Sequence, residues 1–379
     1  MNFQLTEEQK MIQQAARDFA QTELLPGVIE RDEHQKFPAE QIKKLGELGM
    51  MGIMVDPQYG GAGMDTVSYV LAMEEISKID ASASVCMSVN NSLVCWGLEE
   101  YGTEEQKQKY LVPLAKGEVI GAFLLSEPEA GSDATSQRTT AIDMGDHYIL
   151  NGTKNWITNG SSATHYLVIA QTDAAKKHKG INAFIVEKAW AGVTVGAKEN
   201  KMGIRGSDTH TIMFQDVKVP KENRIGDDGF GFTFAMKVLS GGRIGIAAQA
   251  LGIASGAYEL ALKYAKERKA FGTEIMNHQA IQFKLADMAT EIEAARLLVM
   301  KAAWLKDQHE NYDMASAMAK LYASDVAQRV TTEAVQIHGG YGYVKDFHVE
   351  RLMRDAKITQ IYEGTSEVQR IVISRSVLK

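Results

Sequence analysis

The stretch IQFKLADMATEIEAARLLVMKA, residues 281–302, carries apolar or small side chains at alternating steps of four and three. These positions are Ile281, Leu285, Met288, Ile292, Ala295, Val299 and Ala302. Side chains with this spacing lie on one face of an α-helix, so the stretch predicts a long helix with one buried face. We therefore expect a helical bundle over residues 229–379.

Composition extends the helical prediction to the whole chain. Only 6 of the 379 residues are proline, and 18 are methionine, which favours long uninterrupted helices. The apolar share of 45% and the charged share of 23% are those of a folded globular protein. At about 150 residues per domain, the length indicates two or three domains.

The chain divides into three predicted domains, residues 1–118, 119–228 and 229–379. The first is predicted to be helical, with Thr6 and Thr103 as N-caps before glutamates. The second contains short β-rich runs between turn residues, which predict a small barrel or sandwich. These runs are GAFLLS, HYILNG, HYLVIA, INAFIVE and TIMFQDVKV.

Charge and motif content exclude several classes of function. The 41 basic and 48 acidic side chains give a net charge of −7, and no basic block is longer than a pair, so we expect no nucleic-acid partner. The uncharged windows 81–98 and 155–172 are rich in Ser, Thr or Asn, so we expect no membrane insertion. The first residues carry no secretory signal, and Cys86 and Cys95 are expected to be reduced, which together predict a cytoplasmic protein.

Common catalytic and nucleotide-binding strings are missing from the sequence. No GxGxxG string follows a strand, and Walker A, GxSxG and HExxH strings do not occur. The nine histidines never fall at metal-ligand spacing, so no metal site is predicted.

The segment ITQIYEGTSEVQR, residues 358–370, offers one candidate for acid–base chemistry. Glu363 follows Ile361 and Tyr362, and desolvation by such neighbours raises a carboxyl pKa toward that of a general base. Ser366 and Gln369 match a capping box, which predicts a helix start. On these residues alone, a surface glutamate that favours the helix dipole is the competing interpretation.

Further segments have both a functional and an ordinary interpretation. The segments LLSEPEAGSD (124–133) and NWITNG (155–160) contain hydroxyl groups and an indole, which suit the binding of a planar, polar-edged ring. The alternative is an ordinary pair of β turns with a tryptophan in the core. The glycines of QIHGGYGY (336–343) allow close approach of a ligand, or end a helix. Arg268 in ERKAFG lies at the end of a predicted helix. It is either a phosphate-binding side chain or a solvated positive charge in the last turn of that helix.

Taken together, six strings in one order resemble the acyl-CoA dehydrogenase family over essentially the whole chain. They are LLSEPEAGSD, NWITNG, KMGIRGSDT, ERKAFG, QIHGGYGY and IYEGTSE. The resemblance implies a mainly α fold with an N-terminal helical domain, a β-barrel-like middle domain and a C-terminal four-helix bundle. It also implies FAD bound without a dinucleotide fingerprint.

By the same resemblance, several residues are expected to contact FAD. Those lining or flanking the flavin ring are Phe123, Leu125, Ser126, Ser132, Trp156, Ile157 and Thr158. Thr365, Ser366 and Glu367 are expected near the flavin phosphates. A neighbouring subunit is expected to supply Arg268, Gln279, Gln336, Ile337, His338, Gly339 and Gly340, which implies a homo-oligomer, with a tetramer as the expected state.

Glu363 matches the family's catalytic base, which removes the α-proton of an acyl-CoA while a β-hydride passes to flavin N5 and gives the trans-2-enoyl-CoA. The residues expected to bind substrate are Ser132, Ser240, Gly241, Gly242, Arg243 and Gly364. Some relatives carry the base at the position that is Gly242 here, so Gly242→Glu is expected to restore partial activity to a Glu363→Gln variant. An electron-transferring flavoprotein is the expected electron acceptor.

The segment SVCMSVNNSL, residues 84–93, has no arginine for a distal carboxylate, so a dicarboxylate substrate is not expected. Butyryl-CoA is favoured, although Ser240 replaces an aspartate common in butyryl-type members. The alternatives are a branched short-chain acyl-CoA dehydrogenase, an acyl-CoA oxidase and a non-catalytic acyl-CoA-binding relative.

Overall fold

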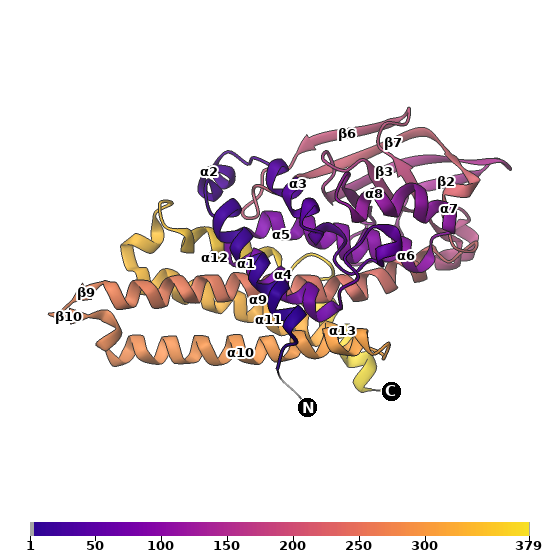
Figure 1. The fold of residues 1–379 in the computed structure, drawn as a ribbon. Coiled ribbons are helices and arrows are strands. Elements are labelled where there is room, and N and C mark those ends of the chain that lie inside the picture. Colours follow the sequence, from indigo (N-terminus) through magenta and orange to yellow (C-terminus); the bar gives the residue numbers. More distant parts are fainter. Residues whose placement is uncertain (1–3, 379) are drawn as a thin grey trace.

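The computed structural model describes residues 4–378, whose N-terminal part is helical (Figure 1). Its helices are α1 (Glu7–Phe19), α2 (Val28–Glu33), α3 (Ala39–Glu47), α4 (Thr66–Ile79), α5 (Ala81–Ser88), α6 (Trp96–Tyr101), α7 (Glu104–Gln106) and α8 (Val112–Ala115). Three π-helical turns extend or join them: η1 (Ala20–Leu24), η4 (Val89–Cys95) and η5 (Lys107–Leu111). Thr6 and Thr103 are N-caps, as the sequence predicts, and the structure adds that each forms a complete capping box.

The middle of the chain forms one eight-stranded sheet. Its strands are β1 (Gly121–Leu124), β2 (Thr140–Asp143), β3 (His147–Thr158), β4 (His165–Gln171), β5 (Ile181–Glu187), β6 (Val193–Lys198), β7 (Thr209–Pro220) and β8 (Arg224–Ile225). The order is β6-β7-β3-β2-β4-β5-β8, and β1 pairs in parallel with β4. The pairing path within residues 4–378 therefore runs from β6 to β8, and it does not close into a complete barrel.

Strand β4 joins the sheet to the helices because both of its faces are buried. Tyr166 and Val168 belong to a core inside the sheet domain. Leu167 and Ile169 belong to the large helical core. This explains the continuous apolar run HYLVIA, which is typical of a strand covered on both sides.

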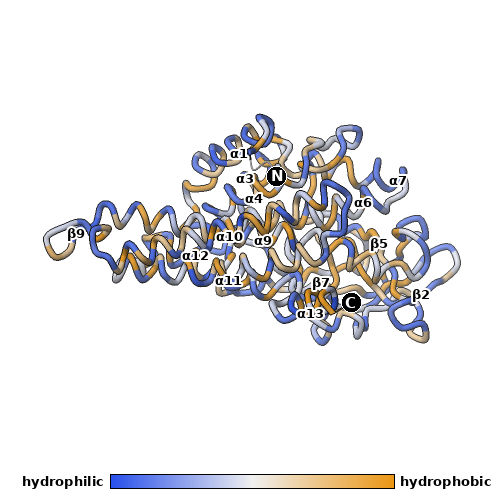
Figure 2. Tube along the Cα trace, turned by 90° about the horizontal axis from the view of Figure 1, so that it is seen from below, coloured by the Kyte–Doolittle hydropathy of each residue, from blue (hydrophilic) through white to orange (hydrophobic). Residues whose placement is uncertain are grey.

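The C-terminal region is a bundle of long helices. They are α9 (Gly231–Glu267), α10 (Gln279–Asp307), α11 (Asp313–His338), α12 (His348–Ile358) and α13 (Ser366–Val377). The predicted face of α10 is confirmed: six of its seven positions are buried and Ile281 is partly buried. Helices α9 and α10 run side by side to the hairpin of β9 (Lys269–Ala270) and β10 (Thr273–Glu274), at the end far from the sheet (Figures 1 and 2).

Short 3-10 helices complete the described chain. They are η2 (Met50–Gly52), η3 (Pro57–Tyr59), η6 (Ala134–Ser136), η7 (Ala174–Gly180), η8 (Lys221–Asn223), η9 (Ile275–Asn277) and η10 (Gly339–Tyr343).

Helix α9 is long and apolar enough to cross a membrane, with a mean hydropathy of 1.2 over its best 18-residue window. However, 83% of that window is buried inside the fold. The helix is therefore accounted for as the core helix of the bundle.

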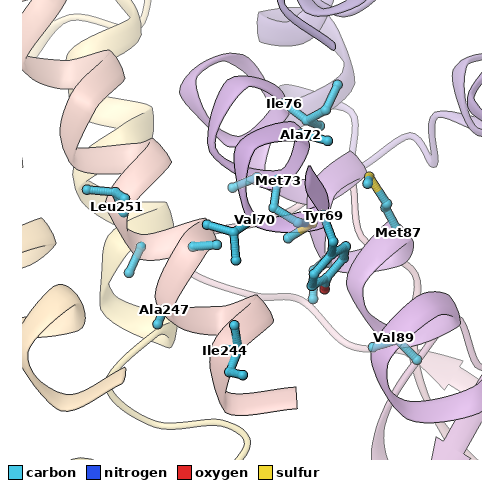
Figure 3. Packing of buried hydrophobic residues seen from close by; sticks show 14 of the residues in the cluster. Tyr69, Val70, Ala72, Met73, Ile76, Met87, Val89, Ile244, Ala247 and Leu251 are labelled. Carbon is cyan, nitrogen blue, oxygen red and sulfur yellow. The ribbon is translucent and has the colours of Figure 1, made fainter. Parts of the chain in front are cut away.

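Helices α4 and α9 pack closely and hold the N-terminal region on the bundle (Figure 3). Tyr69 and Val70 of α4 lie in the same core as Ile244 and Leu251 of α9. The contact is close because α9 presents glycines toward α4. A Cβ at Gly252 would lie 2.4 Å from the carbonyl oxygen of Glu74, so only glycine fits without movement of the backbone.

Candidate active site

Glu363 lies in the turn between α12 and α13, and its backbone is left-handed. Its φ is +49°, and φ of the following Gly364 is +90°. For glutamate this conformation costs about 1 kcal/mol or more, so the surrounding contacts must stabilise it. Such strain is common at functional sites, and here it fixes the direction of the only carboxylate on the turn.

The carboxylate of Glu363 enters the protein against α9. Its Oε2 atom is buried and has no hydrogen-bond partner among residues 4–378. A Cβ at Gly242 would lie 2.2 Å from this oxygen and 2.6 Å from Cδ2 of Leu93. The absence of a side chain at Gly242 therefore makes the space that the carboxylate occupies.

Burial also controls the charge of Glu363. Desolvation raises the pKa of its carboxyl to about 7, and the positive charges of Lys320 and Arg243 oppose this rise. The buried Oε2 atom and the raised pKa agree with the desolvated interpretation of Glu363 rather than with the surface one. A carboxyl with this pKa can both lose and accept a proton near neutral pH.

Two side chains hold the strained turn from outside it. Lys320 Nζ donates to the carbonyl oxygen of Gly364 at 2.7 Å. Gln369 Nε2 donates to the same oxygen at 2.9 Å and to the carbonyl oxygen of Glu363 at 3.2 Å. The sequence analysis missed Lys320, because a lysine in a helical pattern is normally a solvated residue.

The predicted capping box at the start of α13 is shifted by one residue. Thr365, not Ser366, is the N-cap, and its Oγ1 accepts from Val368 N at 3.3 Å. Gln369 cannot close the box because its side chain reaches the carbonyls of Glu363 and Gly364. Ser366 Oγ is left buried without a hydrogen-bond partner in the described chain.

Buried polar side chains cover another side of the carboxylate. Tyr362 donates its hydroxyl to Oε1 of Gln249, and Gln249 Nε2 donates to Ala81 O at 2.9 Å. Tyr69 donates to Ser88 Oγ at 3.0 Å, and burial raises the pKa of its hydroxyl beyond its usual range. The hydroxyls of Tyr69 and Tyr362 thus have partners other than Glu363, whose Oε2 atom is left without one in the described chain.

Of the residues expected to bind substrate, Gly242 lies against the Glu363 carboxylate, the charge of Arg243 acts on it, and Gly364 is adjacent in the chain. Gly241 is buried on α9 but faces Ser92, Lys306 and Tyr312 instead. Arg243 Nη1 contacts Ser240 Oγ at 3.4 Å, while its Nε has no partner in the described residues. Ser132, by contrast, is exposed in the loop after β1.

The loop expected to line the flavin is attached to β3 by a buried ion pair. Lys154 is fully buried and donates to Glu127 Oε1 at 2.7 Å and to Leu125 O at 3.0 Å. Burial lowers the pKa of the Lys154 ammonium to about 8, and Glu127 opposes this. Neither residue was found from the sequence, since the pair joins positions 27 residues apart.

The second flavin segment combines an exposed indole with a buried neighbour. Trp156 has φ +62° and is 63% exposed. Ile157 is buried in the sheet core, so its side chain cannot face a ligand and only its backbone is available. Phe123 and Thr158 are partly buried at the ends of β1 and β3.

The residues expected to serve a neighbouring subunit lie at the far end of the bundle. Arg268, Ile337, His338, Gly339 and Gly340 line one cavity of about 560 Å³, beside Tyr264 and Tyr341. Arg268 lies over the Tyr341 ring at 5.5 Å. Gln279 and Gln336 are exposed and are not among the residues that line this cavity.

The two ends of the expected cofactor site are too far apart to act on one ligand within one subunit. Gly242 and Arg268 are separated by 26 residues of the continuous helix α9. At about 1.5 Å per residue they are about 39 Å apart. The Arg268 cavity therefore cannot complete the site of its own Glu363.

Three domain families match the chain in sequence. The acyl-CoA dehydrogenase N-terminal domain matches residues 6–118, the middle domain 122–217 and the C-terminal domain 229–378. The chain belongs to the acyl-CoA dehydrogenase family. It is an oxidoreductase and an FAD flavoprotein, and the three-domain fold inferred from the resemblance is confirmed.

The chain is similar to characterised members along its full length. It is 54% identical to the short-chain specific acyl-CoA dehydrogenase of Clostridium acetobutylicum over 379 residues, covering 100% of both chains. It is 50% identical to the butyryl-CoA dehydrogenase of Megasphaera elsdenii, with a TM-score of 0.99 and full coverage of both. A chain in a structure of the electron transferring flavoprotein of Acidaminococcus fermentans is 54% identical, also with a TM-score of 0.99 and full coverage.

The described residues fit FAD. Ser366 Oγ is an unpaired buried donor at the start of the 12-residue helix α13, where backbone N–H groups and the helix dipole favour phosphate. The exposed indole of Trp156 offers a face for a planar ring. The site residues assigned by resemblance remain predictions.

Proposed function

We propose that this protein is an FAD-dependent dehydrogenase of short-chain acyl-CoA thioesters, with Glu363 as the base that removes the α-proton. One observation carries the proposal: Glu363 Oε2 is buried, unpaired and adjacent to the bare backbone of Gly242. A base of pKa about 7 can take the weakly acidic α-proton of a thioester at neutral pH.

The groups around Glu363 define the remaining roles. Its backbone N–H makes no hydrogen bond within residues 4–378, so it is free to donate to the thioester oxygen, where negative charge develops. Proton transfer converts the carboxylate to the neutral acid, which burial favours. FAD, when bound, accepts the hydride from the β-carbon.

A short acyl chain is supported by the closed side of the site. Two separate hydrogen-bonded groups close this side: Tyr69 donates to Ser88, and Tyr362 donates to Gln249, which donates to Ala81 O. A Cβ at Gly245, one turn after Gly242, would lie 2.4 Å from the Tyr69 hydroxyl. The butyryl-CoA and short-chain relatives agree with butyryl-CoA as the substrate to test first.

Anaerobic butyryl-CoA is expected to bleach the visible flavin absorption of the holoenzyme. Because the base must be ionised and its pKa is about 7, the single-turnover rate should rise through pH 7 and level off above it. Below the pKa the slope should be about tenfold per pH unit. Stopped-flow absorbance over pH 5.5 to 9 measures this, and a flavin left oxidised by straight and branched short-chain acyl-CoAs alike would refute the proposal.

We infer that the active form is a homo-oligomer, with a tetramer as its expected state. The distance of about 39 Å along α9 supports this, because the Arg268 cavity is too far from the Glu363 of its own subunit to act on the same ligand. Dilution should therefore release flavin as subunits separate. Light scattering with flavin fluorescence tests this, and a fully active monomer would contradict it.

We also propose a cytoplasmic protein that passes its electrons to an electron-transferring flavoprotein. The similarity to a chain in a structure of the electron transferring flavoprotein of Acidaminococcus fermentans supports the acceptor. Both cysteines are free and buried, which agrees with a reducing compartment. Reoxidation of the reduced protein by such a flavoprotein measures the acceptor role, and equally fast reoxidation by oxygen alone would indicate an oxidase instead.

A further inference from the structure

We propose that Lys320 is a positioning residue that holds the turn of Glu363 through the Gly364 carbonyl and electrostatically favours the ionised form of the base. The proposal rests on the proposed function of Glu363. It concerns a residue of α11 that lies 43 positions before the base.

Lys320 is unusual because its ammonium is buried without an ion pair. Its exposed fraction is 0%, and its only hydrogen bond within the described chain is to Gly364 O at 2.7 Å. Unpaired buried charges normally destabilise a fold by several kcal/mol. Lys154, the other fully buried lysine, has the carboxylate of Glu127 at 2.7 Å. Fold stability alone therefore does not account for Lys320.

The opposite charge that acts most strongly on Lys320 is that of Glu363. After desolvation, which lowers the pKa of the Lys320 ammonium to about 8, the attraction of Glu363 is the largest opposing cause. In turn, Lys320 is the largest cause that opposes the raised pKa of Glu363. The two groups therefore titrate as a coupled pair, in which each charge favours the charged form of the other.

Other titratable groups also face the base. Arg243 of α9 stabilises its ionised form, although desolvation lowers the pKa of this guanidinium. Tyr69 of α4 and Tyr362 of the same turn are neutral, because burial raises the pKa of each hydroxyl. Glu367 of α13 acts on Lys320 from the helix start. Among these groups only Lys320 is both cationic and bonded to the turn.

The hydrogen bond explains how a residue on another helix can direct Glu363. The left-handed pair Glu363 and Gly364 is strained, and the Gly364 carbonyl accepts from both Lys320 and Gln369. Without these donors the turn can relax, and the carboxylate would leave the space over Gly242. Lys320 therefore has two separable effects, one of charge and one of geometry.

Three variants of the holoenzyme separate these effects. Lys320→Met removes both the charge and the donor, Lys320→Gln removes the charge and keeps a donor, and Gln369→Met removes the second donor and no charge. Lys301→Met, an exposed site on α10, is the control for the loss of one positive charge. Single-turnover flavin reduction by butyryl-CoA is measured against pH for each variant.

Both Lys320 variants should shift the rising limb of the profile to higher pH, since they remove the positive charge that most strongly opposes the raised pKa of Glu363. At pH 7 they should be several-fold slower than the wild type, and Lys320→Gln should recover more of the high-pH rate than Lys320→Met. Gln369→Met should lower the rate at every pH and leave the limb in place. Lys301→Met should match the wild type.

Infrared difference spectra provide a readout that does not depend on turnover. The C=O band of the protonated Glu363 carboxyl, identified by its loss in Glu363→Gln, should persist to higher pH in both Lys320 variants. Because apolar replacement of a buried charge is often neutral or stabilising, Lys320→Met should fold. A Lys320→Met protein that unfolds would show that the lysine is required for folding and would overturn the assignment.

The assignment of Lys320 would also be overturned if neither the rising limb of the pH profile nor the infrared band shifted in the Lys320 variants. This result differs from failure of the proposed function. That failure would appear as a wild type not reduced by acyl-CoA, or as a Glu363→Gln variant reduced at the wild-type rate.

Discussion

Replacing Glu363 with glutamine is expected to slow flavin reduction by butyryl-CoA by at least about 10²–10⁴-fold, the usual contribution of a general base. The amide preserves the shape of the side chain, so fold, FAD content and ligand affinity should be retained. No other carboxylate lies within hydrogen-bond reach of Glu363 in residues 4–378. Anaerobic single-turnover absorbance isolates this step from product release.

The matched control is Glu47→Gln, an exposed glutamate on α3, which should reduce its flavin at the wild-type rate. If Glu363→Gln also did so, both the mechanism and the assignment of the base would have to be abandoned.

The same variant has a second expected signature, in stability. The folded-state pKa of Glu363 is raised from 4.5 to about 7, so its contribution to stability is fully present below pH 4.5 and is lost as pH rises through 7. Glutamine avoids this loss. The ligand-free variant should match the wild type at low pH and exceed it above pH 7, by at most about 3 kcal/mol. Denaturant unfolding at both pH values measures this difference.

A base placed on α9 by Gly242→Glu should restore part of the activity that is lost without Glu363, provided that the side chain at position 363 is removed as well. Some relatives of similar sequence carry the base at the position of Gly242, which suggests the substitution Gly242→Glu. In this structure a Cβ at that position would lie 2.2 Å from Glu363 Oε2 and 2.6 Å from Cδ2 of Leu93. The amide of Glu363→Gln would still fill this space, so no rescue is expected when Gly242→Glu is combined with that variant. Glycine at position 363 removes the obstacle and also suits φ +49°.

The expected order of single-turnover rates is therefore wild type, then Glu363→Gly with Gly242→Glu, then either single variant. The double variant should exceed Glu363→Gly by about tenfold or more, a small part of the contribution of a general base. Gly242→Glu alone should lose activity, because it displaces Leu93 and places a second carboxylate against the first. A double variant no faster than Glu363→Gly would show that the two positions do not share one reaction site.

Local patterns in the sequence identified much of the fold, and their failures have physical causes. The face of α10 and the caps Thr6 and Thr103 depend on neighbours within one or two turns, and they were predicted correctly. Strands β2, β6 and β8 were missed, because two of them have four residues or fewer and β6 is an edge strand with a mixed burial pattern.

The candidate site shows the same limit more clearly. Glu363 was singled out because its segment, IYEGTSE, is one of six strings that together resemble the family, whereas its immediate neighbours left a surface position open. Lys320 and Lys154 were not, because a lysine is distinguished as buried only by partners 44 and 27 positions away. The shift of the cap from Ser366 to Thr365 has a similar origin, since the side chain of Gln369 is used by the turn of Glu363.

The glycines of α9 limit how this protein can be engineered for heat resistance. Exchanging a helical glycine for alanine usually gains up to about 1 kcal/mol of stability, and a helix this rich in glycine invites the exchange. At Gly252 and Gly256 the new methyl group would lie 2.4 Å from the carbonyl oxygens of Glu74 and Lys78. Overpacking of this kind costs about 1–3 kcal/mol, which exceeds the gain. Thermostabilising libraries should therefore keep these glycines and direct changes to the solvent-facing positions of α10.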